Sequence, residues 1–273
     1  MATDLILADT DPDGITTLTM NMPARLNGWT AGMLAALYAA LDAANESPAT
    51  KAIILTGADP YYCAGVNLGA AFSLAHPKTL HRFIATENAA LFNRFIDLDK
   101  PIIIAVNGPA LGASVTSAVL CDAIIASENA SFSTPFAALG ATPEGCSSVT
   151  FPRIIGDAAP RMLGEEGWKP TGAEAVEIGL ADRVVPHEAL LDEAKAMARG
   201  WLAEGRGRTF RGGFTREELK AVNATESQAL ASAFLHPRFL SGRFKFFWRK
   251  KKRGTALMFL ALWLTSPVWS LLL

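Results

Sequence analysis

One carboxylate in the sequence has surroundings that suit proton transfer. Glu144 lies between Pro143 and Gly145, in a stretch of apolar and small residues that runs from Phe132 to Ser148. Burial in such a setting raises the pKa of a carboxyl group, and a group that titrates near neutral pH can remove and return a proton. The alternative is an acid at the start of the following helix, stabilised by the helix dipole. The residues of this stretch leave both interpretations open.

Two turns of small residues could hold a negatively charged oxygen. In the first, residues 61–68, Gly65 permits a backbone conformation from which the next N–H can point into a cavity. The second, residues 105–115, leads into a helix just after Gly112, and the free N–H groups of a first helical turn attract an anion. Each turn alone is also typical of a strand exit without a ligand. Neither has a P-loop or dinucleotide-binding pattern.

These segments need strands and helices to position them, and the alternation of the two predicts an α/β layered core. Short apolar or alternating runs predict strands at residues 15–20, 52–56, 101–106, 123–126 and 181–185. Helical spacing predicts helices that include residues 34–41, 91–96, 190–202 and 217–234. Thr171 and Glu174 form the pattern of a capping box at the start of another helix. The glycine-rich, basic segment 205–213 is expected to be a flexible linker.

Three stretches together resemble a known family. They are Tyr62 to Leu68 (YCAGVNL), Asn107 to Ser114 (NGPALGAS) and Thr142 to Ser148 (TPEGCSS). In order and spacing they resemble the enoyl-CoA hydratase/isomerase (crotonase) superfamily, over roughly residues 3–235. Thr142 to Ser148 is similar to the peroxisomal-type Δ3,Δ2-enoyl-CoA isomerases. Residues 25–27 and 175–185 are further stretches of this kind.

The resemblance implies a fold and a set of site residues. The fold would be α/β, a crotonase-like spiral core of ββα turns with a C-terminal helical region. The catalytic residue would be Glu144, and the backbone N–H groups of Val66 and Ala113 would form an oxyanion hole. The substrate-binding residues would be Ala64, Gly65, Asn67, Leu68, Gly112 and Pro143. Asn67 departs from the family pattern, where an aspartate is usual.

The resemblance also separates two reactions. Hydratases of this family use two glutamates, at the positions where this sequence has Thr116 and Phe136. The isomerase position is filled, by Glu144. The implied reaction is isomerisation of 3-enoyl-CoA to 2-trans-enoyl-CoA in unsaturated fatty acid β-oxidation, without a separate cofactor, since coenzyme A is part of the substrate. The alternatives are a hydratase or thioester hydrolase of the same fold, or a non-catalytic acyl-CoA-binding protein.

Composition excludes several other classes. The chain has 273 residues and a net charge of −1, which gives no reason to expect nucleic acid as a partner. Its four histidines have no metal-binding spacing, so no metal site is expected. Its three cysteines, Cys63, Cys121 and Cys146, are too few for a disulfide framework and are expected to be reduced and buried.

The C-terminal part differs from the rest. Residues 249–253 are all basic, and the chain, at −1 with these five charges included, carries −6 without them. Residues 254–273 have no charge, so we expect membrane contact through residues 249–273. The alternative is an apolar helix packed on the body or on another subunit. The expected organisation is a spiral core at 1–200, a helical oligomerisation region at 201–253 and a hydrophobic tail at 254–273.

The resemblance suggests a homotrimer or hexamer in a peroxisome or a mitochondrion. The N-terminus lacks the pattern of a signal peptide, and the chain does not end in Ser-Lys-Leu. Candidates for an acyl tunnel are Trp29, Phe72, Phe83, Phe92 and Phe95, with core packing as the alternative. Lys100 and Arg153 are candidates for contacts with coenzyme A phosphates, with solvated surface charge as the alternative.

Overall fold

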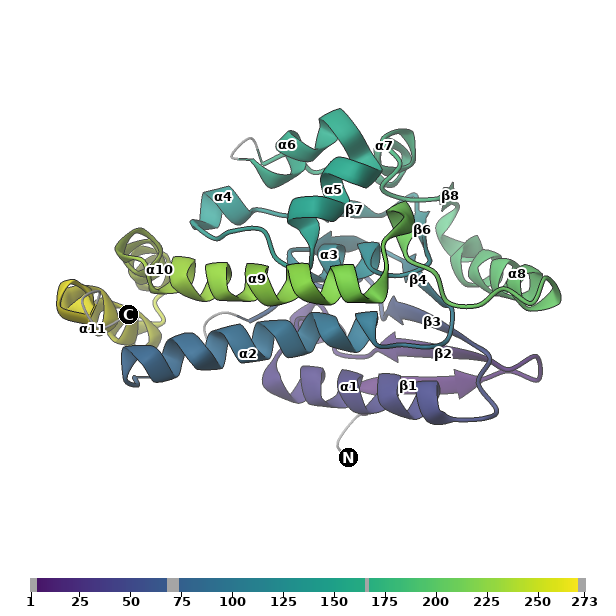
Figure 1. Ribbon diagram of the computed structural model, residues 1–273, viewed down its shortest axis with the longest axis horizontal. Helices are drawn as coiled ribbons and strands as arrows, with labels where there is room; N and C mark the ends of the chain where they lie inside the picture. The colour runs from purple at the N-terminus through teal and green to yellow at the C-terminus, as the bar shows by residue number, and fades with distance from the viewer. Residues whose placement is uncertain (1–3, 68–73, 165–166, 270–273) are drawn as a thin grey trace.

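A computed structural model describes residues 4–67, 74–164 and 167–269 (Figure 1). The strands are β1 (Ile6–Thr10), β2 (Ile15–Met20), β3 (Ala52–Gly57), β4 (Ile102–Val106), β5 (Pro109–Leu111), β6 (Ala123–Ser127), β7 (Ser131–Ser133) and β8 (Arg183–Val185). The helices of the first part are α1 (Ala31–Glu46), α2 (Pro77–Ile96), α3 (Ala113–Val119), α4 (Phe136–Leu139), α5 (Ser147–Ile155), α6 (Ala159–Leu163) and α7 (Gly172–Glu177). The helices that follow are α8 (Leu190–Ala203), α9 (Arg216–Leu235), α10 (Pro237–Arg249) and α11 (Arg253–Trp269).

The main sheet has the strand order β1-β2-β3-β4-β6-β8. β1 and β2 are antiparallel, and the other neighbours are parallel. A second, small sheet pairs β5 with β7 in parallel. The strands and capping box expected from the sequence are therefore present, with ends that differ by one or two residues.

Both faces of the main sheet are covered, which explains the continuous apolar runs. In β3, Ile53 and Leu55 face the larger core, while Ala52 and Ile54 face the opposite side. On that opposite side the strands pack against α8 through Leu190, Ala194, Ala198 and Trp201. Alternate residues of one strand thus enter two different cores.

A third core joins the C-terminal helices to α2. Its buried residues include Ile84 of α2, Phe234 of α9, Phe239 of α10 and Phe259 of α11. In Figure 1, α9 lies alongside α2, and α10 and α11 lie together beyond their ends. Phe259 stacks on Phe247 of α10, with ring centroids 5.6 Å apart, so α11 packs on α10 within this third core.

The tail therefore follows the second interpretation of its sequence. Ala256, Phe259 and Leu262 of α11 are buried in the third core. Leu264 and Val268 are exposed on another side of the helix. No helix within the described ranges has the length and apolar character needed to cross a membrane. Contact of residues 249–273 with a membrane surface stays a prediction.

The expectation of a flexible linker at residues 205–213 is wrong from Arg208 onwards. The guanidinium of Arg208 forms an ion pair of 2.9 Å with Asp122, and both side chains are almost fully buried. Arg211 pairs with Asp182 at 2.6 Å. The charges that made the segment look solvated instead anchor it to the loops that precede β6 and β8.

Removing the ring of Phe259 should destabilise the protein. Phe259→Ala is expected to lower the free energy of unfolding by about 3–5 kcal/mol, because the ring is fully buried. Leu264→Ala, on the exposed side of the same helix, should change it by less than about 0.5 kcal/mol. Chemical denaturation of both variants measures the difference, and equal effects would contradict the docking of α11.

Candidate active site

Glu144 lies on the loop between α4 and α5, and two left-handed residues shape this loop. Gly145 has φ 63° and Cys146 has φ 64°. A Cβ at position 145 would come within 2.4 Å of the Phe92 ring, so only glycine fits there. Phe92 belongs to α2 and is fully buried. The loop is therefore pressed against the core directly after Glu144.

The carboxylate of Glu144 has a specific partner. Asn88 of α2 donates from Nδ2 to Oε2 of Glu144 at 2.7 Å. The other end of the Asn88 amide accepts a hydrogen bond of 2.8 Å from the Ser227 hydroxyl of α9. That bond fixes which way the Asn88 amide faces. The carboxylate is thus oriented by α2, and α2 is in turn tied to α9.

Burial raises the pKa of Glu144 from 4.5 to about 7. The hydrogen bond from Asn88 acts against this, since it favours the ionised form. The nearby carboxylate of Glu226 raises the pKa further. Glu144 can therefore exist in both protonation states near neutral pH, as a proton carrier requires.

The two small-residue turns lie side by side at one edge of the main sheet. They follow β3 and β4, which are parallel neighbours, so their carboxyl ends meet at the same edge. Cys63 donates from its N–H to Pro109 O at 3.3 Å and accepts from Leu111 N at 3.0 Å. A Cβ at position 65 would lie 2.6 Å from Leu111 O, so Gly65, at φ 76°, permits this close approach.

The amides of Val66 and Ala113 have no acceptor from the described parts of the protein. The backbone of Trp29 forms hydrogen bonds with the residues on either side of Val66. Trp29 N donates to Gly65 O, and Asn67 N donates to Trp29 O. Ala113 is the first residue of α3, where an N–H has no partner within the helix. Both amides can therefore donate to a negatively charged oxygen.

Contacts connect these turns to the loop of Glu144. Gly112 N donates to Ser133 O at 2.7 Å, in the strand that precedes the Glu144 region. On the other side, Trp29 pairs with Val66 and stacks on Phe95, with ring centroids 6.4 Å apart. Phe95 lies on α2, the helix whose Phe92 meets Gly145.

The remaining predicted binding residues differ in how exposed they are to solvent. Ala64 donates from its N–H to Leu26 O at 3.0 Å, and Pro143 is half-buried next to Glu144. Asn67 is exposed. Leu68 and the tunnel candidate Phe72 lie outside the described residues.

The two positions that would carry glutamates in hydratases have side chains without a carboxyl group here. Thr116 is fully buried in α3, with its hydroxyl donating to Ala113 O at 3.3 Å. Phe136 is buried at the start of α4. Neither side chain can exchange a proton with a substrate.

Several other sequence candidates have different roles. Trp29, Phe92 and Phe95 are fully buried core residues, whereas Phe83 is 49% exposed. Lys100 donates from Nζ to Ala44 O and Ser47 O, so its ammonium group holds the end of α1. Arg153 lies over the Phe214 ring at 3.8 Å. The three cysteines are free and buried, as expected.

Sequence reasoning missed four polar residues behind Glu144: Asn88, Asn223, Glu226 and Ser227. Each sits within the apolar stripe of its helix, between residues such as Ile84 and Leu91 in α2 or Leu219 and Leu230 in α9. A polar residue at a core position is costly unless it is satisfied. Polar residues at apolar positions of these two helices were therefore the feature of the sequence that could have indicated a buried polar network.

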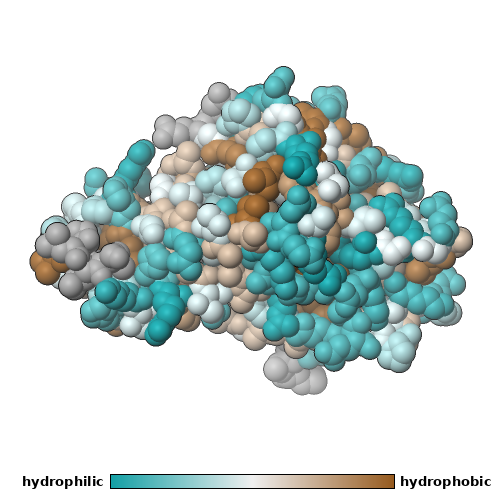
Figure 2. Space-filling view, viewed as in Figure 1, coloured by the Kyte–Doolittle hydropathy of each residue, from teal (hydrophilic) through white to brown (hydrophobic). Residues whose placement is uncertain are grey.

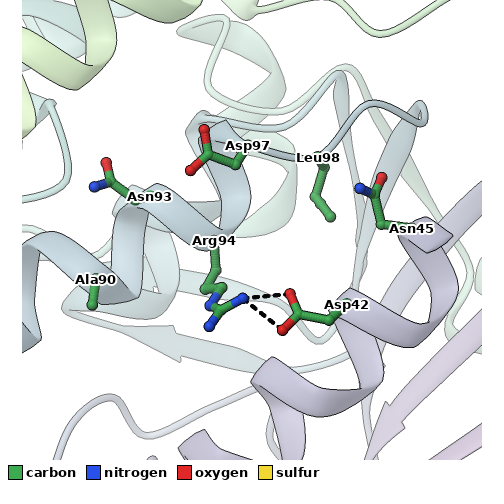
Figure 3. A pocket seen from close by; sticks show the side chains of 7 residues that line it. All are labelled: Asp42, Asn45, Ala90, Asn93, Arg94, Asp97 and Leu98. Atoms are coloured by element: carbon green, nitrogen blue, oxygen red, sulfur yellow. Dashed lines mark hydrogen bonds and ion pairs between the residues drawn. The ribbon is translucent and has the colours of Figure 1, made fainter.

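A hollow of about 300 Å³ lies between α1 and α2. Figure 3 shows the side chains that line it, and none of the groups named above is among them. One guanidinium nitrogen of Arg94 donates to both carboxylate oxygens of Asp42 across it, at 2.6 and 2.5 Å. Both side chains are more than two fifths exposed. A paired, solvent-open arrangement of this kind offers no free group for catalysis. Within the described ranges, no cluster of histidine, cysteine and acidic residues could hold a metal.

Known proteins resemble this chain over most of its length. It is 37% identical over 257 residues to enoyl-CoA delta isomerase 2 of Homo sapiens, covering 90% of this chain and 64% of the human protein. The peroxisomal enoyl-CoA delta isomerase 3 of Mus musculus is 37% identical over 181 residues, covering 65% and 56%. Crotonyl-CoA hydratase of Syntrophomonas wolfei is 34% identical, covering 69% and 72%. The chain thus spans less than two thirds of the two isomerases.

Solved structures share the fold. An enoyl-CoA hydratase from Mycobacterium avium superposes with a TM-score of 0.63 at 28% identity, covering 84% of this chain and 96% of that one. An enoyl-CoA hydratase/isomerase from Pseudoalteromonas atlantica gives 0.72 at 24% identity, covering 90% and 97%. The predicted fold class, an α/β crotonase-like core with a C-terminal helical region, is confirmed. Residues 10–247 match the family described as enoyl-CoA hydratase/isomerase, and the chain belongs to that family.

Proposed function

We propose that the chain isomerises 3-enoyl-CoA to 2-trans-enoyl-CoA, with Glu144 as the only proton carrier. The observation that carries the proposal is the Glu144 carboxylate, which is held by Asn88 and whose pKa burial raises to about 7. Buried Thr116 and Phe136 at the two hydratase positions support the same choice. The family's acyl-CoA chemistry supplies the substrate class.

The reaction needs one proton to move from C2 to C4. Ionised Glu144 takes a proton from C2, and the electrons of that C–H bond pass into the thioester, whose oxygen becomes the oxyanion of a dienolate. The N–H groups of Val66 and Ala113 donate to this oxygen. Protonated Glu144 then gives the proton to C4, and the double bond ends between C2 and C3.

One carboxylate is enough for this reaction and is poorly suited to hydration. Adding water requires that a water molecule be oriented and deprotonated while a second proton reaches carbon. Glu226 does not serve as that second acid, because both its oxygens accept backbone N–H groups. Isomerisation returns the carboxylate to its starting state after each turnover.

The remaining parts of the proposal follow the family. The substrate brings its own coenzyme A, and the proton shift consumes no further cofactor. The substrate-binding role extends to Ala64, Gly65, Asn67, Leu68, Gly112 and Pro143. The peroxisomal isomerase of Mus musculus favours a peroxisome as the compartment. Assembly as a homotrimer or hexamer stays a prediction.

Replacing the carboxylate should abolish the isomerase reaction. Glu144→Gln keeps the size and the hydrogen bond from Asn88 but cannot take a proton, so kcat is expected to fall at least about 100-fold. The assay follows the absorbance of the conjugated thioester formed from 3-enoyl-CoA. The control is Glu46→Gln. Glu46 is an exposed residue of α1, so this variant should keep full activity.

Three outcomes would contradict the proposal. They are an inactive wild-type protein, full activity in Glu144→Gln, and water addition to 2-enoyl-CoA as the faster reaction. The last of these would favour a hydratase, as the Syntrophomonas wolfei relative is named.

The pH dependence of catalysis should report Glu144. The base must be ionised, so kcat/KM is expected to rise with pH and level off above about 7, the pKa of Glu144. A profile that is flat from pH 5 to pH 8 would contradict a catalytic base with this pKa.

The same ionisation should affect stability in the opposite direction. The folded protein holds the Glu144 proton more tightly than the unfolded chain, whose pKa is near 4.5. The contribution of Glu144 to stability is therefore full below about 4.5 and is lost as pH rises through about 7. Glu144→Gln should consequently gain thermal stability relative to wild type between pH 5 and pH 8. An unchanged difference across that range would contradict the raised pKa.

A further inference from the structure

A second buried acid, Glu226 of α9, holds the segment that follows Glu144. Glu226 is only 6% exposed to solvent. Oε2 accepts from Cys146 N at 2.6 Å, and Oε1 accepts from Ser148 N at 2.9 Å. Because both oxygens accept from N–H donors, this geometry fits the ionised carboxylate.

These two bonds fix the backbone just where it needs support. Cys146 has φ 64°, a conformation that costs free energy for a residue other than glycine. Cys146 is also the N-cap of α5, and its own side chain makes no capping bond. Glu226 supplies from another helix the acceptor that the start of α5 lacks.

The neighbouring residue of α9 holds the other side of Glu144. The Ser227 hydroxyl donates to Asn88 Oδ1 at 2.8 Å, and Asn88 donates to Glu144 at 2.7 Å. One turn of α9 therefore contacts both the loop that carries the base and the amide that orients it. Figure 1 shows α9 running alongside α2.

Burial raises the pKa of Glu226 above its usual value. Its hydrogen bonds with Ser148 and Cys146 act against this, since they favour the ionised form. Glu144 is faced by Asn88 from α2 and by Glu226 from α9. Glu226 also acts on the Cys146 thiol, which burial keeps neutral by raising its pKa to about 12.

We propose that Glu226 is a positioning residue for Glu144: its two hydrogen bonds hold the loop of the base, and its buried charge disfavours a second negative charge on Glu144. The proposal rests on the assignment of Glu144 as the base. Two like charges in a poorly solvated region raise each other's proton affinity. Glu226 thus keeps the base from being permanently ionised, so that it can hold the proton between C2 and C4.

The test separates charge from shape with two variants. Glu226→Gln keeps the length of the side chain but removes its charge and turns one acceptor into a donor. Glu226→Asp keeps the charge and is one methylene shorter. Glu217→Gln, an exposed acid on the same helix, is the control. Each full-length protein is studied by ¹³C NMR titration of its glutamate carboxyl groups, with the Glu144 signal assigned by its absence in Glu144→Gln.

In Glu226→Gln, the titration midpoint of Glu144 should move to lower pH, and kcat for 3-enoyl-CoA should fall on the order of 10- to 100-fold as the loop shifts. The rising limb of the kcat/KM profile should move to lower pH by the same amount. The control should match wild type in all three measurements. An unmoved Glu144 midpoint in folded Glu226→Gln would overturn the proposal, even if activity were lost.

Glu226→Asp keeps the test decisive if Glu226→Gln does not fold. With the charge kept and the reach shortened, the Glu144 midpoint should stay near its wild-type value while kcat falls. A midpoint shifted down in this variant, or an unchanged kcat, would count against the proposal. The NMR titration needs no substrate, so it judges Glu226 separately from the isomerase assignment, which fails only if the wild-type protein does not act on 3-enoyl-CoA.

Discussion

The interaction on which the rest depends is the contact between one poorly solvated carboxylate and one amide donor. Burial pushes Glu144 towards its neutral form, and the hydrogen bond from Asn88 pulls it towards the ionised form. Their balance leaves the group near its midpoint at neutral pH. Ser227 holds the other end of the Asn88 amide, so that the amide nitrogen faces Glu144. The close packing of α2 with α9 therefore has a chemical purpose as well as a structural one.

The sheet provides the second half of the site. β3 and β4 run parallel, so the turns that follow them emerge at one edge, and Gly65 allows their backbones to approach closely. Packing of Trp29 against Phe95 and of Phe92 against Gly145 then connects that edge to the loop of Glu144. On the face shown in Figure 2, most of the surface is hydrophilic, and a hydrophobic patch lies near the centre of the view.

Much of this arrangement could be predicted from the sequence, because it depends on local patterns. The apolar runs marked β3, β4 and β6, and the small residues around Gly65 and Gly112 marked the turns. What could not be predicted depends on contacts between distant segments. The Asn88–Ser227 bond joins residues 139 positions apart, and the bond between Cys146 and Glu226 spans 80. The basic run before α11 suggested a membrane flank, but the burial of Phe259 against Phe247 depends on tertiary packing that hydropathy does not reveal.

The most direct test of the central claim is a crystal structure of the chain with a non-reactive acyl-CoA bound. The thioester oxygen should lie about 2.7–3.1 Å from the backbone nitrogens of both Val66 and Ala113. A carboxylate oxygen of Glu144 should lie about 3–3.5 Å from C2, with C4 within reach of the same group. A thioester bound away from these two amides, or an acyl chain that leaves Glu144 facing only solvent, would contradict the account.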